Sequence, residues 1–278
     1  MKLIRLAGAL SALALTVTLA AGGATTAQAA EQTSTPAYAA LGDSYSAGLG
    51  AGGYDSASGD CKRSTRAYPA LWAAAHAPAR FSFAACSGAR TGDVLDEQLS
   101  SLSSATGLVS ISIGGNDAGF ADTMSTCVFN GDGPCLDRIS KARAFIQNEL
   151  PAKLDSVYSA ISSRAPRAQV VVLGYPRFYR TGGTCVGLSD TKRKAINAAA
   201  DLINTVTAKR AADHGFRFGD VNTTFAGHEL CSGSAWLNSV TLPVDESYHP
   251  TASGQSRGYL PVFSSAAVPG AAPAHRRH

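Results

Sequence analysis

One serine and one histidine, far apart in the sequence, have the surroundings that nucleophilic catalysis requires. Ser44 ends a Gly42-Asp43-Ser44 turn that directly follows the apolar run 37–41. A free serine hydroxyl is a poor nucleophile near neutral pH, so it needs a base. His249 is our candidate base, because it follows the last predicted strand and should lie at the same edge of the sheet as Ser44. Gly-Asp-Ser alone is also a common turn without chemistry, so the hypothesis depends on its partners.

The other five histidines are weaker candidates for the base. Two lie at the ends of predicted helices, where a cation is favourable without any chemistry, and two lie in the Ala/Pro-rich C-terminal stretch. His228 lies in a late loop, like His249, and remains the second choice. The other four are His76, His214, His275 and His278.

An acyl-transfer site also needs hydrogen-bond donors for the oxygen anion that develops during the reaction. Gly88 follows the second predicted strand, and its lack of a side chain lets its N–H approach a substrate closely. Asn116 follows the third strand, within Gly114-Gly115-Asn116-Asp117, and its side-chain amide can donate. The same stretch is suited to capping a helix N-terminus. The two interpretations are compatible.

Apolar segments and the stretches between them predict how these residues are positioned. Strands separated by helical patterns, without an internal repeat, predict an α/β protein with a three-layer α/β/α fold around a parallel five-stranded sheet. We expect flavodoxin-like strand order, one domain, and the chemistry at the carboxyl ends of the strands. Predicted strands cover 37–41, 81–84, 108–113, 169–174 and 216–221, and helices cover 64–78 (capped by Ser64), 93–102, 136–163 (broken near Pro151) and 191–213.

Three features that resemble cofactor, metal or nucleic-acid sites have simpler explanations. Residues 48–53 spell G-x-G-x-x-G, but no helical pattern opens at the third glycine, so no dinucleotide site is expected. The cysteines and histidines lack the spacing of zinc ligands, so neither a metal nor another cofactor is expected. The triplet Lys192-Arg193-Lys194 falls in a helical pattern and is predicted to be a solvated face, not a nucleic-acid surface.

The first 29 residues have the features of a secretory signal peptide. Basic residues precede the apolar run 6–21, and small residues follow up to Ala29, after which we expect cleavage. An uncleaved membrane anchor is the alternative, but the run is short for a membrane span. We therefore expect an exported chain with one domain over 30–263 and a disordered, Ala/Pro-rich tail over 264–278.

The cysteines agree with export, because an even number suits disulfide formation in an oxidising compartment. We predict sequential pairing, since Cys127 and Cys135 bracket a Gly/Asn/Pro-rich loop that a local bridge would hold. Other pairings remain open from the sequence alone. The six cysteines are Cys61, Cys86, Cys127, Cys135, Cys185 and Cys231.

Four short blocks resemble, in type and order, those of the GDSL or SGNH hydrolases. They are Gly42-Asp43-Ser44, Gly88, Gly114-Gly115-Asn116-Asp117 and His249, and together they span nearly the whole predicted domain. The similarity extends over residues 40–46, 86–93 and 111–120. With the six cysteines and the export signal, these segments resemble the secreted actinomycete lipases and phospholipases A1 of that family.

The resemblance implies a role for each residue and the SGNH form of the flavodoxin-like α/β/α fold, with no cofactor. Ser44 would be the nucleophile, and His249 would be the general base and acid. The Ser44 N–H, the Gly88 N–H and the Asn116 side chain would form the oxyanion hole.

The group that orients the His249 imidazole stays open at this stage. The common family pattern has Asp three residues before the histidine, where this chain has Glu246. Either the Glu246 carboxylate or the Ser247 main-chain carbonyl would hold the ring. Ser46 stands where the last glycine of a G-x-S-x-G elbow would be, so an ordinary α/β-hydrolase is not expected.

The resemblance implies a secreted, monomeric serine hydrolase of carboxylic esters of lipids, acting as a lipase, an esterase or a phospholipase A1. It would contact a lipid surface transiently and would have no nucleic-acid partner. A carbohydrate acetylesterase of the same family is the main alternative, and a secreted binding protein without catalysis is another. The sequence leaves open the choice among triacylglycerol, phospholipid and soluble ester, the acyl position and the chain length.

Overall fold

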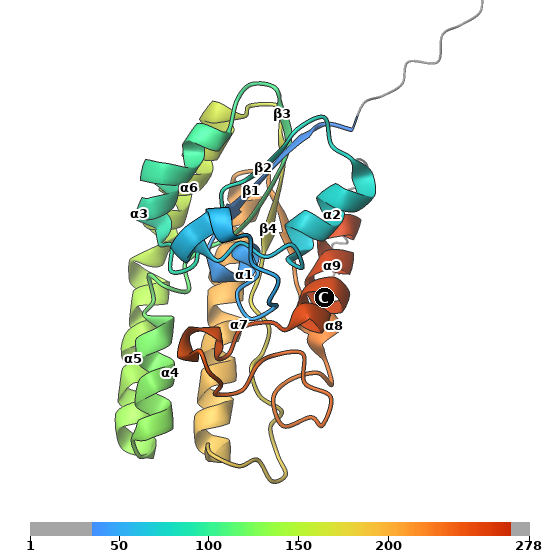
Figure 1. Ribbon diagram of the computed structural model, residues 1–278. Coiled ribbons are helices and arrows are strands. Elements are labelled where there is room, and N and C mark those ends of the chain that lie inside the picture. Colours follow the sequence, from blue (N-terminus) through green and yellow to red (C-terminus); the bar gives the residue numbers. More distant parts are fainter. Residues whose placement is uncertain (1–34, 268–278) are drawn as a thin grey trace, which may run out of the picture. The chain divides into compact units, whose positions relative to one another are not determined.

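One parallel sheet carries the fold in residues 35–267, the part of the chain that the computed structural model describes (Figure 1). The strand order is β2-β1-β3-β4-β5, and every neighbouring pair is parallel. This is the flavodoxin-like order, and the predicted α/β/α class is confirmed. The strands are β1 (Ala37–Gly42), β2 (Phe81–Phe83), β3 (Thr106–Ser112), β4 (Gln169–Leu173) and β5 (Arg217–Gly219).

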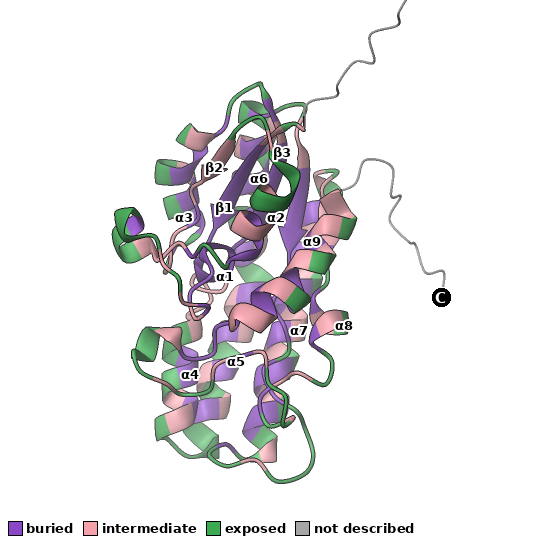
Figure 2. Cartoon of the chain, turned by 45° about the vertical axis from the view of Figure 1, so that its right-hand side comes forward, coloured by how far each residue is buried: buried purple, intermediate pink, exposed green. Residues whose placement is uncertain are grey.

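Helices cover both faces of the sheet, which explains why its central strands are apolar along their length. On one face, α9 (Leu260–Ala267) contacts β4, β5 and α2 (Tyr68–His76). On the other, α7 (Asp190–Asp213) contacts β4, β5 and α6 (Leu150–Arg164). Figure 2 shows the central strands β1 and β3 buried between these layers.

The remaining helical elements are short, apart from α4 and α5. These two pack against each other, and α5 packs against α7 (Figure 1). The α-helices are α1 (Ser44–Ala47), α3 (Thr91–Asp93), α4 (Phe120–Phe129), α5 (Asp132–Asn148) and α8 (Asn222–Phe225). Single 3-10 or π turns cover Ser56–Cys61, Val94–Gln98, Leu99–Ser101, Val244–Glu246 and Gly254–Tyr259.

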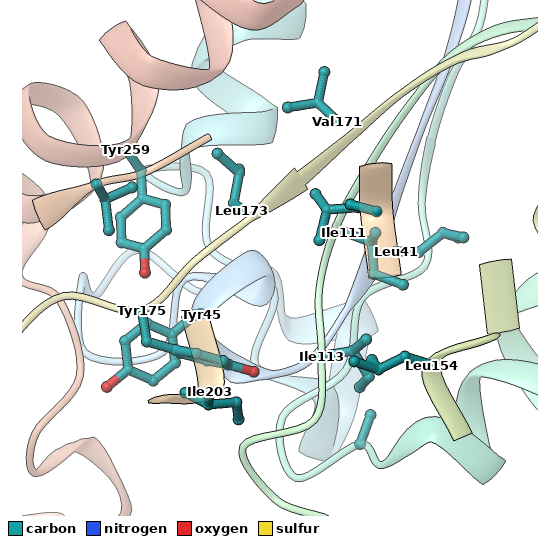
Figure 3. Packing of buried hydrophobic residues seen from close by; sticks show 14 of the residues in the cluster. Leu41, Tyr45, Ile111, Ile113, Leu154, Val171, Leu173, Tyr175, Ile203 and Tyr259 are labelled. Atoms are coloured by element: carbon teal, nitrogen blue, oxygen red, sulfur yellow. The ribbon is translucent and has the colours of Figure 1, made fainter. Parts of the chain in front are cut away.

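The core contains both aliphatic and aromatic side chains. Aliphatic side chains such as Ile111 of β3 and Ile113, just beyond that strand, belong to the same buried cluster as Leu154 of α6. Aromatic rings lie toward both ends of the strands. Near the start of β1, Tyr38 stacks on Phe81 and Phe263. At the carboxyl ends, Tyr45 meets Tyr175 edge to face with 5.1 Å between ring centroids (Figure 3). The hydroxyl groups of these rings give the apolar core a polar boundary just below the turn of Ser44.

A buried glutamine fixes the end of β1. The Gly42 N–H donates to Gln98 Oε1 at 2.7 Å, and Gln98 Nε2 donates back to the Gly42 carbonyl at 2.9 Å. Gly42 has φ +115°, and a Cβ there would lie 2.2 Å from the Ser112 carbonyl oxygen. Only glycine therefore fits where β1 turns toward Ser44.

The cysteines pair sequentially, as predicted: Cys61 with Cys86, Cys127 with Cys135, and Cys185 with Cys231. The first bond ties the Gly-rich loop after α1 to the turn after β2. The second ties α4 to the start of α5. The third joins the loop before α7 to the loop after α8.

Two local predictions were wrong. Ser64 does not cap α2: Ala67 precedes that helix, while the Ser64 hydroxyl accepts from the Arg66 N–H at 2.9 Å. Lys192 and Arg193 are 6% and 2% exposed, not a solvated face. Their cationic groups satisfy main-chain carbonyls at the ends of neighbouring segments, since Lys192 donates to Cys127 and Asn130 and Arg193 to Arg180 and Gly183. Burial is possible because these donors are hydrogen-bonded.

Helix α4 was not predicted from the sequence, and some predicted element boundaries differ from those in the structure. Residues 120–129 carry no strong pattern, yet they form α4 beside the carboxyl end of β3. Residues 264–267, which were predicted to belong to the disordered tail, are helical, because α9 continues through Ala267. The predicted signal peptide and residues 268–278 lie outside the described part of the chain.

Replacing Gln98 with leucine should destabilise the fold, because the buried Gly42 N–H would lose its partner. The expected loss is about 1–3 kcal/mol in the free energy of unfolding. Urea denaturation measures it, and Gln147→Leu on the exposed side of α5 is the matched control. Equal stability of the two variants would contradict the role of Gln98.

Candidate active site

Ser44 is held at the carboxyl end of β1 by the residue before it. Asp43 is the N-cap of α1, and its Oδ1 accepts from the Tyr45 N–H at 3.0 Å. Ser44 is the first residue of that short helix and is 6% exposed. The apolar strand, the glycine turn and the aspartate cap together fix the direction of the Ser44 side chain.

The Asp43 carboxylate is buried and joins three strands. Its Oδ1 accepts from the Ser112 hydroxyl at 2.7 Å, at the end of β3. Its Oδ2 accepts from the Tyr175 hydroxyl at 2.5 Å, just beyond β4. Burial raises the pKa of Asp43 to about 6, although the hydrogen bonds from Tyr175 and Ser112 act in the opposite direction.

Ser44 and His249 are in direct contact although 205 positions separate them. His249 Nε2 lies 2.7 Å from Ser44 Oγ, and Nδ1 lies 3.0 Å from the Ser247 carbonyl oxygen. A carbonyl only accepts, so it places the proton of the neutral ring on Nδ1. Nε2 is then unprotonated and accepts the Ser44 hydroxyl, which is the arrangement of a general base with its nucleophile.

The loop that carries His249 is tied to the turn of Ser44. The Tyr45 hydroxyl donates to the Tyr248 carbonyl at 2.7 Å. The Asn238 N–H donates to the His249 carbonyl at 2.9 Å, and the Asn238 side chain donates to the Gly50 carbonyl at 3.0 Å. These contacts from three segments keep the imidazole beside the hydroxyl.

Glu246 makes a different contact from the one the sequence suggested. Its Oε1 accepts from the Tyr54 hydroxyl at 2.7 Å, and that hydroxyl accepts from the Gly50 N–H at 2.9 Å. Of the two candidates for orienting His249, the Ser247 carbonyl is the one in hydrogen-bond contact with the ring.

Burial lowers the pKa of His249 to about 4, and the Ser247 carbonyl only partly offsets this effect. The ring is therefore neutral, and able to accept a proton, throughout the mildly acidic and neutral range.

Gly88 and Asn116 line the same cleft as Ser44 and His249, a hollow of about 610 Å³. Gly88 has φ +82°, and no atom lies within 4 Å of where its Cβ would be, so its main chain is open to a ligand. Asn116 donates one amide hydrogen to the Ala89 carbonyl at 3.0 Å, which fixes the amide and leaves its second N–H. All four sequence-predicted residues therefore meet in one place.

The cleft has apolar walls with few charges. Helix α4 and the loop before His249 both contribute to its walls. The charged residues in its lining are Asp60 and Asp245. The apolar lining residues are Leu49, Phe120, Ala121, Met124, Val128, Phe129, Val240 and Val244.

The second-choice histidine is occupied elsewhere. His228 Nδ1 contacts the Ser234 carbonyl at 2.7 Å, and its ring stacks on Trp236 with 3.6 Å between centroids. Among residues 35–267, no group of three or more His, Cys, Asp or Glu side chains is placed to hold a metal. The same residues include no helix long and apolar enough to cross a membrane.

Tyr175 is a site residue that the sequence reading missed. Its hydroxyl donates to Asp43 and accepts from the Gly115 N–H at 3.1 Å, so it joins the turn of Ser44 to the turn of Asn116. One signal for it was available, since Tyr175 follows the β4 segment just as Asn116 follows β3. Carboxyl ends of parallel strands are where site residues gather.

Comparison with known proteins places this geometry in a family. The model of the GDSL-like Lipase/Acylhydrolase family matches residues 40–257. A lipase from Streptomyces rimosus is 69% identical over 267 residues, which is 96% of this chain and 100% of the relative. Lipase 1 from Streptomyces coelicolor is 66% identical over 268 residues, again 96% of this chain and 100% of the relative.

Solved structures agree with the sequence comparison. The extracellular lipase of Streptomyces rimosus is 73% identical with a TM-score of 0.83, and the match covers 84% of this chain and 100% of that one. Phospholipase A1 of Streptomyces albidoflavus NA297 is 60% identical with a TM-score of 0.83, over the same shares of the two chains.

Replacing His249 with glutamine should change how stability depends on pH. The folded pKa of about 4 lies below the unfolded value of 6.5, so the unfolded chain binds the extra proton as the pH falls between these values. Wild-type stability should therefore fall relative to His249→Gln, by about 3 kcal/mol between neutral pH and pH 4. Urea denaturation across that range measures the difference, with His76→Gln as control. A difference that stays constant would contradict the lowered pKa.

Proposed function

The chain belongs to the GDSL-like lipase/acylhydrolase family, and on this basis we propose that it hydrolyses carboxylic esters of lipids with Ser44 as nucleophile. It is a carboxylic ester hydrolase of the lipase and esterase type. The observation that carries the residue roles is the 2.7 Å contact between Ser44 Oγ and His249 Nε2. The 3.0 Å contact of Nδ1 with the Ser247 carbonyl supports the same assignment, because it fixes the tautomer that can accept the serine proton.

In the first half-reaction, His249 takes the proton of Ser44 as the oxygen attacks the ester carbonyl carbon. The carbonyl oxygen becomes an anion and accepts from the Ser44 N–H, the Gly88 N–H and the Asn116 amide. The protonated ring is held by the Ser247 carbonyl and gives its proton to the alcohol oxygen. The carbon–oxygen bond breaks and the alcohol leaves, while the acyl group stays on Ser44.

In the second half-reaction, a water molecule replaces the alcohol. His249 takes a proton from the water molecule as the water oxygen attacks the acyl carbon. The second oxyanion then accepts hydrogen bonds from the same three donors. The imidazolium then returns the proton to Ser44 Oγ as the acid is released. No cofactor takes part in either proposed step.

The cleft favours lipid acyl chains as substrates. Its walls along α4 are apolar, and the side chains of Phe120 and Met124 offer a dry surface beside the serine. Relatives named as lipases and a structure named as a phospholipase A1 support this choice. A carbohydrate acetylesterase would need polar groups for sugar hydroxyls, and no observation favours that alternative.

Export and a monomeric state complete the proposal. The structure of an extracellular relative and three disulfides in this chain support export. The catalytic groups we assign all come from one chain, which supports a monomer as the active unit. A binding protein without catalysis is disfavoured, because it has no need of a serine and an imidazole in contact.

Replacing Ser44 with alanine should abolish hydrolysis of p-nitrophenyl butyrate and labelling by a fluorophosphonate, since both need the serine oxygen. His249→Ala should lose nearly all turnover because the base is gone. Glu246→Gln is the matched control and should stay close to wild type, since Glu246 contacts Tyr54 and not the imidazole. Retained activity in folded Ser44→Ala would refute the assignment.

Replacing Asn116 with alanine should lower kcat by about 100- to 1,000-fold with little change in KM, because the amide is used after the substrate carbonyl becomes an anion. Circular dichroism would show that the variant is folded. A rise in KM at unchanged kcat would mean that Asn116 contributes to ordinary substrate binding and not to the oxyanion hole.

A further inference from the structure

The large hydrophobic side chains that are exposed in residues 35–267 gather around one opening. Three line the cleft of Ser44, and another lies between two of these in the sequence. The fifth lines a neighbouring hollow of about 280 Å³. We call this set the rim: Phe129, Val186, Val240, Leu242 and Val244, which are 81%, 102%, 57%, 89% and 69% exposed.

The cleft and the neighbouring hollow adjoin each other. They share Val128, Val240 and Tyr248 in their walls. The rim therefore runs from the end of α4 across the loop 240–244 to Val186. Single exposed hydrophobic residues need no explanation, but their collection around one opening marks an interaction surface.

The rim is braced in its exposed position. The Cys127–Cys135 disulfide closes the end of α4 two residues before Phe129. The Cys185–Cys231 disulfide holds the residue next to Val186. These bonds limit how far either side chain can turn back into the core.

We propose that the rim is the surface through which the protein binds the face of an electrically neutral or zwitterionic lipid aggregate. The proposal rests on the function above and adds where the protein meets its substrate. The rim surrounds the opening through which an ester carbonyl reaches Ser44, so a lipid surface on the rim lies next to the hydroxyl. A second protein on the same surface would close that opening.

The charged side chains that line the opening are acidic, which favours a neutral lipid surface over an anionic one. No lysine or arginine is among the described residues that line either hollow. Asp60 and Asp245 line the cleft and would repel anionic head groups. Binding should therefore depend on apolar contact and persist at high salt, where charge attraction is screened.

The experiment measures binding in the Ser44→Ala background, where no product accumulates, with sedimenting phosphatidylcholine vesicles. Val186→Ser with Leu242→Ser should lower the partition coefficient about tenfold or more, since neither side chain would then bury apolar surface. Neither residue lines the cleft of Ser44. With Ser44 restored, the double variant should hydrolyse dissolved p-nitrophenyl butyrate at the wild-type rate and phosphatidylcholine vesicles more slowly.

Two further variants complete the design. Ala74→Ser with Ala75→Ser on the exposed side of α2 is the matched control and should bind vesicles as the parent does. Leu242→Trp should bind more tightly, and its fluorescence should shift to shorter wavelength when vesicles are added.

Three results would overturn the proposal. The first is equal vesicle binding by the parent and the rim double variant. The second is binding that needs phosphatidylglycerol and disappears at high salt. The third is a parent chain that binds no vesicles but forms a dimer, with the dimer lost in the rim double variant. That result would assign the rim to contact with a second copy of the chain. If the wild-type chain does not hydrolyse the dissolved ester, the proposed function is refuted instead. The two failures are therefore distinct.

Discussion

The site depends on one buried carboxylate. Asp43 accepts hydrogen bonds from the Tyr45 N–H, the Ser112 hydroxyl and the Tyr175 hydroxyl, and these donors come from α1, β3 and the segment after β4. Without such donors a buried carboxylate is very unfavourable, so the group holds these segments in one arrangement. The pKa of Asp43 is raised to about 6 because burial disfavours the ionised carboxylate more than the hydrogen-bond donors stabilise it. The position of Ser44 therefore depends on an ionised carboxylate whose burial is unfavourable, and the packing of the rest of the fold must offset this free energy.

Burial acts in opposite directions on the two titratable groups that flank Ser44. It raises the pKa of Asp43 and lowers the pKa of His249, because in each case it disfavours the charged form. The Asp43 contribution to stability therefore falls as the pH rises from 3.8 to about 6, and the His249 contribution falls as the pH drops from 6.5 to about 4. The two dependences partly cancel in the acidic range. A site with two buried ionisable groups can in this way avoid a sharp loss of stability on acidification.

The sequence was sufficient for the fold and for Ser44, Gly88 and Asn116 at strand ends, although it did not reveal Tyr175 after β4. Strand segments with helical stretches between them determine a parallel sheet, and a parallel sheet brings Ser44, Gly88 and Asn116 to one edge. The sequence could not decide between Glu246 and Ser247, because that choice depends on Tyr54, a residue almost 200 positions away that takes the Glu246 carboxylate. Lys192 was misjudged for a similar reason. Its place in a helical pattern predicted a solvated face. In the structure its ammonium group donates to the Cys127 carbonyl, on a helix that is distant in the sequence.

The Cys61–Cys86 bond links the catalytic turn to the redox state of the surroundings. Cys86 lies two residues before Gly88, and its own N–H donates to the Gly42 carbonyl at 3.0 Å. Thiols stay reduced in a bacterial cytoplasm and oxidise outside it. A chain whose Cys61 and Cys86 are reduced therefore has its nucleophile in the sequence but lacks the covalent bond that anchors the Gly88 turn. The position of one oxyanion donor that we assign is then coupled to disulfide chemistry as well as to the hydrogen bonds of the sheet.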